Sequence, residues 1–237
     1  MKKIIFLGLI LVSQFLQSQE VESLFIDARD YVYKSDYEKG FKLFDSIRKL
    51  NYVNKETLSN VYFWLGFIKR NGGDLIDYEA SKEYYLESIK LNPKNSLSYL
   101  NLGLLTERQF NNDSLALKYL IKSYNLDTLN YAPFFELHNR NYFNKIDFVI
   151  KITNEAIENG MDYDYDGEVS KSETLYAYYS QWSNYIQKYG NGDSTARIAE
   201  ETIKYGKNYP RIGKFEYWNG WVPDLYDYLS RYHMYLK

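Results

Sequence analysis

Hydrophobic and polar residues alternate with a helical period along most of the chain. Residues 36–47 begin with polar side chains and then place Gly40, Phe44 and Ile47 on one side. A longer stripe of large side chains recurs every three or four residues; its members are Leu175, Tyr178, Trp182, Tyr185, Ile186 and Tyr189. Such spacing is typical of amphipathic helices that bury one face. Clusters of Asn, Asp, Gly and Pro separate these segments, so the pattern predicts an all-α protein.

A two-helix pattern repeats along the first half of the chain. The second helix of each unit has a small residue followed four positions later by a large one; these pairs are Gly40 and Phe44, Ser81 and Tyr85, and Ala116 and Leu120. Another small residue recurs in the helix before each pair; these residues are Ala28, Gly66 and Gly103. A small residue lets two helices approach closely, and the large one fills the space between them. Pro93 follows the second unit, where a proline would not continue the helix.

This arrangement resembles the tetratricopeptide repeat (TPR), a unit of about 34 residues made of two antiparallel helices. The resemblance implies a right-handed solenoid of antiparallel helix pairs with a concave groove lined by the first helices. Three TPR-like repeats would occupy residues 19–130, and degenerate helical repeats would occupy residues 131–210. Residues 211–237 would form an aromatic C-terminal cap, in which residues 218–221 make a turn and Pro223 opens a capping helix.

Residues 1–18 are expected to be a secretory signal peptide. A short basic start precedes an apolar run from Ile4 to Val12, and a polar stretch then ends at the small residue Ser18. The apolar run is too short to cross a bilayer, which takes about 20 residues. The chain has no cysteine, which excludes both disulfides and a lipidated cysteine anchor. We therefore expect a bacterial periplasmic or secreted protein, without stable membrane insertion once the signal peptide is cleaved.

Residues 162–173 match the EF-hand calcium loop, D-x-D-x-D-G-x5-E, at every specified position. Carboxylates at loop positions 1, 3 and 5 converge on one hard cation, and a backbone carbonyl at position 7 adds a ligand. The glycine permits a sharp turn, and the final glutamate closes the shell with both oxygens. The candidate metal ligands are Asp162, Asp164, Asp166, Glu168 and Glu173. The alternative is a solvated acidic linker, so calcium is a candidate cofactor and no other cofactor is indicated.

The composition narrows the classes of function. The formal net charge is −2, from 29 basic and 31 acidic residues, so a nucleic-acid backbone is a poor match. The two histidines, His138 and His233, lie far apart in the sequence. The chain contains no P-loop, GxGxxG, GxSxG or HExxH motif. We assign no catalytic residue and expect a protein that is not an enzyme.

The aromatic content indicates binding. The chain has 27 Tyr, 13 Phe and 4 Trp, more than a slim helical core can bury. Exposed Tyr and Trp are good anchors for a peptide or a glycan. We expect an exported scaffold that holds a protein or peptide in its groove, and the candidate groove residues are Tyr31, Tyr62, Lys69, Tyr99 and Arg108. The alternative is a carbohydrate-binding accessory protein of a surface glycan-uptake system.

Overall fold

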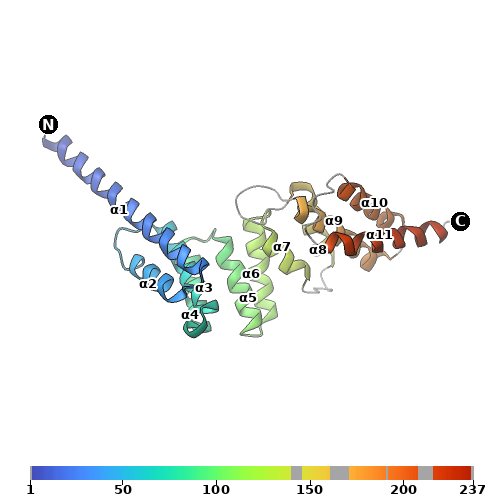
Figure 1. Cartoon of the computed structure of the whole chain (residues 1–237), viewed down its shortest axis with the longest axis horizontal. Coiled ribbons are helices and arrows are strands. Elements are labelled where there is room, and N and C mark those ends of the chain that lie inside the picture. Colours follow the sequence, from blue (N-terminus) through green and yellow to red (C-terminus); the bar gives the residue numbers. More distant parts are fainter. Residues whose placement is uncertain (1, 140–145, 161–170, 191, 208–215, 236–237) are drawn as a thin grey trace. The chain divides into compact units, whose positions relative to one another are not determined.

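The computed structural model describes residues 2–139, 146–160, 171–190, 192–207 and 216–235 (Figure 1). Regular structure in these ranges is helical throughout, which confirms the predicted all-α class. The helices are α1 Lys2–Tyr33, α2 Tyr37–Ile47, α3 Lys55–Asn71, α4 Tyr78–Leu91, α5 Ser96–Arg108, α6 Asp113–Leu126, α7 Tyr131–Asn139, α8 Ile146–Asn159, α9 Lys171–Tyr189, α10 Asp193–Lys207 and α11 Glu216–Tyr235, with a short 3-10 turn at Gly73–Leu75. The chain divides into two compact units, residues 1–126 and residues 127–237.

Unit 1 consists of three successive helix pairs. Helix α1 packs on α2, α3 on α4, and α5 on α6 (Figure 1). Each second helix also contacts the first helix of the next pair, as α2 does α3 and α4 does α5. The first helices touch one another as well, from α1 to α3 and from α3 to α5. The layer formed by α1, α3 and α5 is therefore continuous across the unit.

Asparagine and aspartate side chains fix where the helices of unit 1 begin. The Oδ1 atom of Asn54 accepts a hydrogen bond from the backbone N–H of Thr57 at 2.9 Å. The same bond, from the N–H three residues further on, recurs at four other helix starts; the capping residues are Asp36, Asp77, Asn95 and Asn112. Each cap satisfies a backbone donor that the helix itself leaves unpaired.

Glycines lie where the helices of a pair touch, as the repeat pattern predicts. A Cβ atom on Gly66 would lie 2.8 Å from the ring of Tyr85, in the facing helix α4. A Cβ atom on Gly103 would lie 3.0 Å from Cγ of Leu120, in α6. Both contacts are too close for a larger residue, which confirms the predicted role of Gly66 and Gly103 as close-approach positions.

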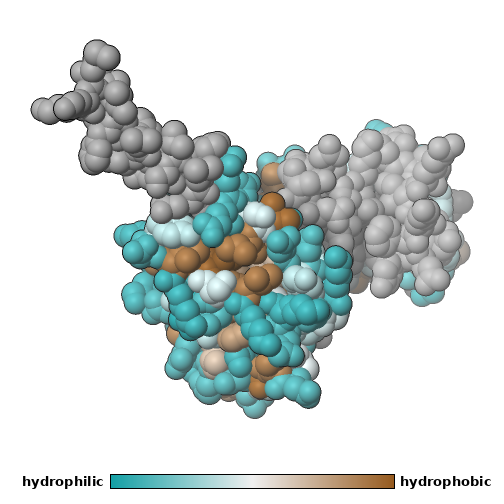
Figure 2. Space-filling model, turned by 60° about the vertical axis from the view of Figure 1, so that its left-hand side comes forward, coloured by the Kyte–Doolittle hydropathy of each residue, from teal (hydrophilic) through white to brown (hydrophobic). Residues whose placement is uncertain are grey.

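The core of unit 1 is apolar and rich in aromatic rings. Phe44 and Ile47 of α2 and Leu65 of α3 are completely buried. The ring of Phe44 is stacked on that of Trp64, with 6.0 Å between the centroids, and meets the ring of Phe25 edge-on at 5.3 Å. Figure 2 shows one face of this unit, where hydrophobic residues gather in the upper part and hydrophilic residues occupy most of the rest.

Unit 2 has its own core. Helices α7 to α11 contact one another in chain order, each packing on the next. Val149, Thr153 and Ala156 of α8 are buried, as predicted for the second helix of a repeat. Trp182 of α9 and Leu225 of α11 belong to one apolar cluster with residues of α10.

The predicted turn at residues 218–221 is wrong. Helix α11 begins at Glu216 and runs through this segment, so Pro223 lies inside the helix instead of opening it. A proline removes one N–H donor and crowds the preceding turn, which weakens a helix without always ending it. Large side chains at three- or four-residue intervals favour the helix here; they are Trp218, Trp221, Leu225 and Leu229. Across the described ranges, no helix has both the length and the low polarity needed to span a membrane.

Candidate functional site

The five predicted groove residues lie on α1, α3 and α5, and none of them lines the pocket described below. Tyr31 is capped by Lys39 of α2, whose Nζ atom lies 5.2 Å from the centroid of the tyrosine ring. Lys69 likewise lies over Phe41 of α2, with its Nζ atom 5.2 Å from the ring centroid. Both side chains are therefore turned toward the second helix of the first pair.

Two of the other three predicted groove residues also lie against a second helix. The ring of Tyr62 lies 6.0 Å from that of Tyr84 in α4, and the ring of Tyr99 lies 6.4 Å from that of Tyr119 in α6. Arg108 is exposed at the end of α5. Four of the five side chains thus contact second helices, and the role of all five in a groove stays a prediction.

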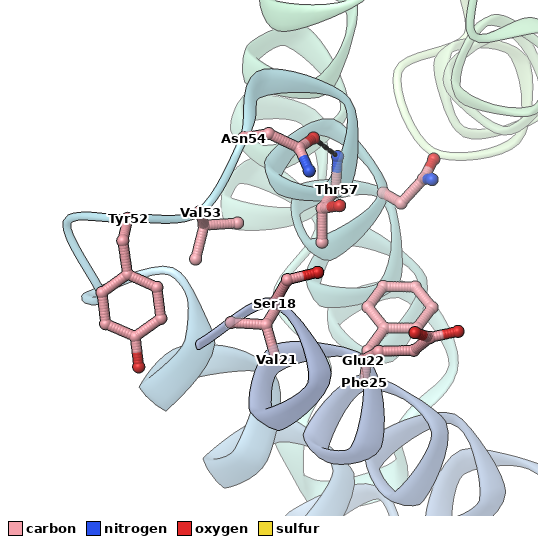
Figure 3. A pocket seen from close by; sticks show the side chains of 9 residues that line it. Ser18, Val21, Glu22, Phe25, Tyr52, Val53, Asn54 and Thr57 are labelled. Carbon is pink, nitrogen blue, oxygen red and sulfur yellow. Dashed lines mark hydrogen bonds between the residues drawn. The ribbon is translucent and has the colours of Figure 1, made fainter. Parts of the chain in front are cut away.

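The structure instead places a pocket of about 570 Å³ between α1 and the start of α3 (Figure 3). One wall comes from α1, one from the segment that joins α2 to α3, and one from the first turns of α3. The lining residues are Ser18, Val21, Glu22, Phe25, Tyr52, Val53, Asn54, Thr57 and Asn60. Sequence reasoning did not find this pocket, although Val21 and Phe25 lie four residues apart on one face of α1.

Local contacts hold the walls of the pocket in place. The ring of Phe25 rests against buried Phe44, and the cap from Asn54 to Thr57 fixes the entry into α3. The hydroxyl of Tyr52 donates a hydrogen bond to Oε2 of Glu20, at 3.2 Å, which ties the connecting segment to α1. Partial burial, together with the neighbouring Glu20 carboxylate, raises the pKa of Tyr52. The phenol is therefore neutral at physiological pH and acts as a donor.

The pocket has an apolar floor and a polar, negative margin. Val21 is buried, and Val53 and Phe25 are partly buried around it. Figure 3 shows Val21 and Ser18 pointing up from α1 toward Val53 and Thr57. Among the nine lining residues, Glu22 is the one with a formal charge at neutral pH. Within the described ranges Glu22 has no ion-pair or hydrogen-bond partner, so its carboxylate is available to a ligand.

A second group of aromatic side chains lies on the same two helices, α1 and α3. Tyr33, at the end of α1, is 68% exposed, and its ring meets that of Trp64 edge-on at 5.7 Å. The ring of Trp64 in turn contacts the rings of Phe63 and Phe67, at 5.3 Å and 5.6 Å. We call the pocket together with Tyr33, Trp64 and Phe67 the first-helix face.

The predicted calcium ligands cannot be placed as a set. Asp162, Asp164, Asp166 and Glu168 lie outside the described residues, and Glu173 lies in the first turn of α9, where only the backbone is described. The described helices α8 and α9 flank this segment and pack on each other. Elsewhere in the described ranges, no group of three or more His, Asp or Glu residues could hold a metal ion.

The structure describes the surroundings of one histidine, His233. His138 lies in α7, and only its backbone is described. His233 is exposed in α11, and its Nε2 atom lies 3.9 Å from Oε1 of Glu200. A single long contact at the surface is a weak electrostatic interaction.

Comparisons with known proteins establish the fold. A structure described as the crystal structure of MamA protein matches with a TM-score of 0.54 and 16% identity, covering 84% of this chain and 97% of that chain. A second crystal structure of MamA matches with a TM-score of 0.52 and 15% identity, over 76% of this chain and 95% of that chain. A putative kinesin light chain from Podosopora anserina, with nearly identical TPR-like repeats, matches with a TM-score of 0.52 and 12% identity, over 80% and 97% of the two chains.

No family model and no curated protein matches the chain. At these identities the structural matches show the fold alone. The chain has a TPR-type helical-repeat fold, and the resemblance found in the sequence is confirmed at that level.

Proposed function

We propose that the chain is an exported, non-catalytic scaffold that binds a segment of another protein along the first-helix face of unit 1. Stacked helix pairs present a long surface in which successive first helices each contribute side chains. Helices α1 and α3, which carry the first-helix face, contact each other, and α3 in turn contacts α5. A surface of this kind suits an extended peptide better than a small molecule.

The observation that carries the proposal is that the pocket and an exposed aromatic ring, that of Tyr33, lie on one pair of contacting first helices. The pocket has a volume of about 570 Å³, within the usual range of ligand sites. Tyr33 and Trp64 lie on the same two helices as the pocket walls. Rigid aromatic side chains at the centre of an interface supply most of its binding energy, at a small entropic cost.

The chemistry of the lining supports a binding role over a catalytic one. A nucleophile and a base have to lie within hydrogen-bonding reach of each other. The lining offers the hydroxyls of Tyr52 and Thr57, that of Ser18 before cleavage, and one carboxylate, that of Glu22. Glu22 is hydrogen-bonded to none of these hydroxyls, and no histidine lines the pocket.

The proposal is tested by site-specific photo-crosslinking. A photoreactive phenylalanine analogue replaces Asn60, which is exposed at the margin of the pocket, and the matched control replaces Glu83, which is exposed on α4. We expect the chain with the analogue at position 60 to capture a defined protein in cells, and the chain with the analogue at position 83 to capture much less of it. Equal capture at both positions, or none at position 60, would contradict the proposal.

Export is tested separately from binding. The basic start and the short apolar run support cleavage after Ser18, so the protein isolated from its own cells should begin at Gln19. Mass spectrometry of that protein measures its N-terminus directly. A chain that keeps residues 1–18 would contradict export, while leaving the binding proposal standing.

A further inference from the structure

We propose that the pocket between α1 and α3 takes a lysine or arginine side chain of the bound segment, with an apolar residue of the same segment beside it. This inference rests on the proposed function and names the chemistry that the partner must offer. Three properties of the pocket support it: its size, the arrangement of its apolar floor, and the sign of its charge.

The floor fits the apolar part of such a segment. Val21, Phe25 and Val53 form apolar walls, and the ring of Tyr52 closes the side next to the connecting segment (Figure 3). A volume of about 570 Å³ is large enough for more than one side chain. Lysine and arginine carry long aliphatic stems that lie along apolar surface while the charged end stays in water.

The charge at the margin selects a cation. Glu22 is exposed, has no partner within the described ranges, and no Lys, Arg or His lines the pocket. A second carboxylate, on Glu20, lies next to the pocket as the acceptor for Tyr52. The two carboxylates outnumber the single α-ammonium group that cleavage after Ser18 would create on Gln19, so the margin favours a positive ligand and disfavours a carboxylate or phosphate.

Neutral polar groups of α3 complete the site. The Thr57 hydroxyl and the Asn60 side-chain amide line the side opposite α1. The Asn60 Oδ1 atom already accepts a long hydrogen bond, 3.3 Å, from Asn95, so its NH₂ group remains to be matched by an acceptor. A peptide backbone carbonyl next to the cationic residue supplies such an acceptor.

The test uses synthetic peptides and the purified chain that begins at Gln19, the form expected after export. Three blocked heptapeptides share one sequence with a leucine on each side of the central residue, which is lysine, its uncharged analogue norleucine, or glutamate. Methyl resonances of Val21 and Val53 report binding by NMR. We expect the lysine peptide to shift both resonances and to bind about two- to fivefold more tightly than the norleucine peptide. The glutamate peptide should bind most weakly.

Two variants test whether the Glu22 carboxylate causes the preference for the lysine peptide. Glu22→Gln, at an exposed position, should remove the lysine preference while leaving the norleucine affinity unchanged. Glu83→Gln makes the same charge change at an exposed position on α4 and should leave the preference intact. The preference should also shrink as salt is added, because exposed charges are screened.

The outcomes separate this inference from the proposed function. Equal affinities for the lysine and norleucine peptides, or a preference that survives Glu22→Gln, would overturn the cation assignment. If the photo-crosslink at position 60 still forms in that case, the scaffold function stands and the inference alone fails. If the lysine preference is found but no protein is crosslinked, the scaffold proposal fails while the pocket chemistry stands.

Discussion

At the scale of single residues, the close spacing between paired helices depends on glycine, which has no side chain to separate them. Gly66 lies against the ring of Tyr85, which is completely buried, and against the backbone carbonyl of Ser81. A buried ring has no free space to move into, because protein interiors are packed as densely as organic crystals. The close contact between α3 and α4 therefore requires glycine at position 66.

We predict that Gly66→Ala destabilises unit 1 by about 1–3 kcal/mol, the usual cost of overpacking a filled contact. The new methyl group would lie 2.8 Å from the Tyr85 ring and 3.2 Å from the Ser81 carbonyl oxygen. The matched control is Gly192→Ala, since a Cβ atom there meets nothing within 4 Å. Urea denaturation of both variants measures the difference. If the two variants are equally stable, the contact assigned to Gly66 is wrong.

At the scale of helices and the contacts between them, buried hydroxyl groups join the second pair to the third. Ser59 of α3, Ser88 of α4 and Ser98 of α5 are all completely buried. The Oγ atoms of Ser59 and Ser88 lie 3.0 Å apart, and those of Ser88 and Ser98 lie 2.7 Å apart. Buried polar groups are costly unless they are paired, so this chain of hydroxyls stabilises one mutual placement of the three helices.

We predict that Ser88→Ala costs about 1–3 kcal/mol, because it leaves the buried Ser98 hydroxyl without its partner, whereas the Ser59 hydroxyl still donates to the backbone carbonyl of residue 88. The control is Ser46→Ala on α2, where an exposed hydroxyl bonds only to the carbonyl of Leu43 in its own helix. The control should stay within about 0.5 kcal/mol of the unmodified chain. Thermal melting compares the two, and a loss in Ser88→Ala no larger than in the control would contradict the structural role of the network.

The helix caps predict a pH dependence at the start of α2. The side chain of Lys39 donates to Asp36 at 2.7 Å, and this bond holds the pKa of the Asp36 carboxyl below its ordinary value of 3.8. A lowered pKa means that the folded state favours the carboxylate. The stabilisation is therefore complete above pH 3.8 and is lost as the pH falls below that value.

We predict that the stability difference between the unmodified chain and Asp36→Asn narrows as the pH falls from about 5 to about 2. Asparagine caps a helix as well as aspartate does, but it cannot titrate or pair with Lys39. Melting temperatures of both chains across this range give the difference at each pH. A difference that stays constant would show that the carboxylate does not stabilise the folded state through this bond.

Local patterns in the sequence predicted the elements well, because each depends on neighbours a few residues away. The close-approach glycines, and the large residues four positions after the small residue of each second helix, act within one helix pair. The pocket did not follow from such patterns, since its walls come from α1, from Tyr52 and Val53, and from α3. Nothing in the spacing of any one segment indicates that these three surfaces leave a space between them.

The sequence pattern does not determine which side of a first helix faces the groove. A first helix turns one side toward its own second helix and another toward solvent, and both sides repeat with the same period. Tyr62 and Tyr99 are predicted to face the groove, and the structure places their rings near Tyr84 and Tyr119 of the second helices. Choosing between the two sides requires the crossing of the helices, which is a tertiary property.

At the scale of the whole molecule, the chain contains two units with separate cores. The core of unit 1 contains Phe44 and Leu65, and that of unit 2 contains Trp182 and Leu225. Separate cores allow an event in one unit to change its stability while the other is unaffected. The acidic segment, residues 162–173, belongs to unit 2. Any effect of a bound cation should therefore be confined to that unit.

Contacts between α8 and α9 would transmit such an effect. Lys188 of α9 donates to Asp147 of α8, and this bond raises the pKa of Lys188. Asn184 donates to the Thr153 hydroxyl at 3.3 Å, in the middle of the same interface. The acidic segment joins the end of α8 to the start of α9, so a cation bound to it would act directly on these two packed helices.

We predict that calcium stabilises unit 2 and leaves unit 1 unchanged. Without a cation, four carboxylates within one loop repel one another; they belong to Asp162, Asp164, Asp166 and Glu173. Binding to the folded state alone adds about 2.7 kcal/mol at a hundredfold excess over Kd. Hydrogen exchange should therefore slow in α8 and α9 when millimolar calcium is added, and exchange in α3 to α6 should not change.

Two controls separate a ligand shell from a solvated acidic linker. Glu173→Gln should abolish the calcium effect, because the last loop position closes the shell with both carboxylate oxygens. Magnesium should do less than calcium, since its small octahedral shell accepts a bidentate carboxylate poorly. A linker would respond to both cations alike, and only as far as ionic strength screens its charges. Equal responses to both cations would rule out the calcium site, while the helical-repeat fold, which rests on other residues, would be unaffected.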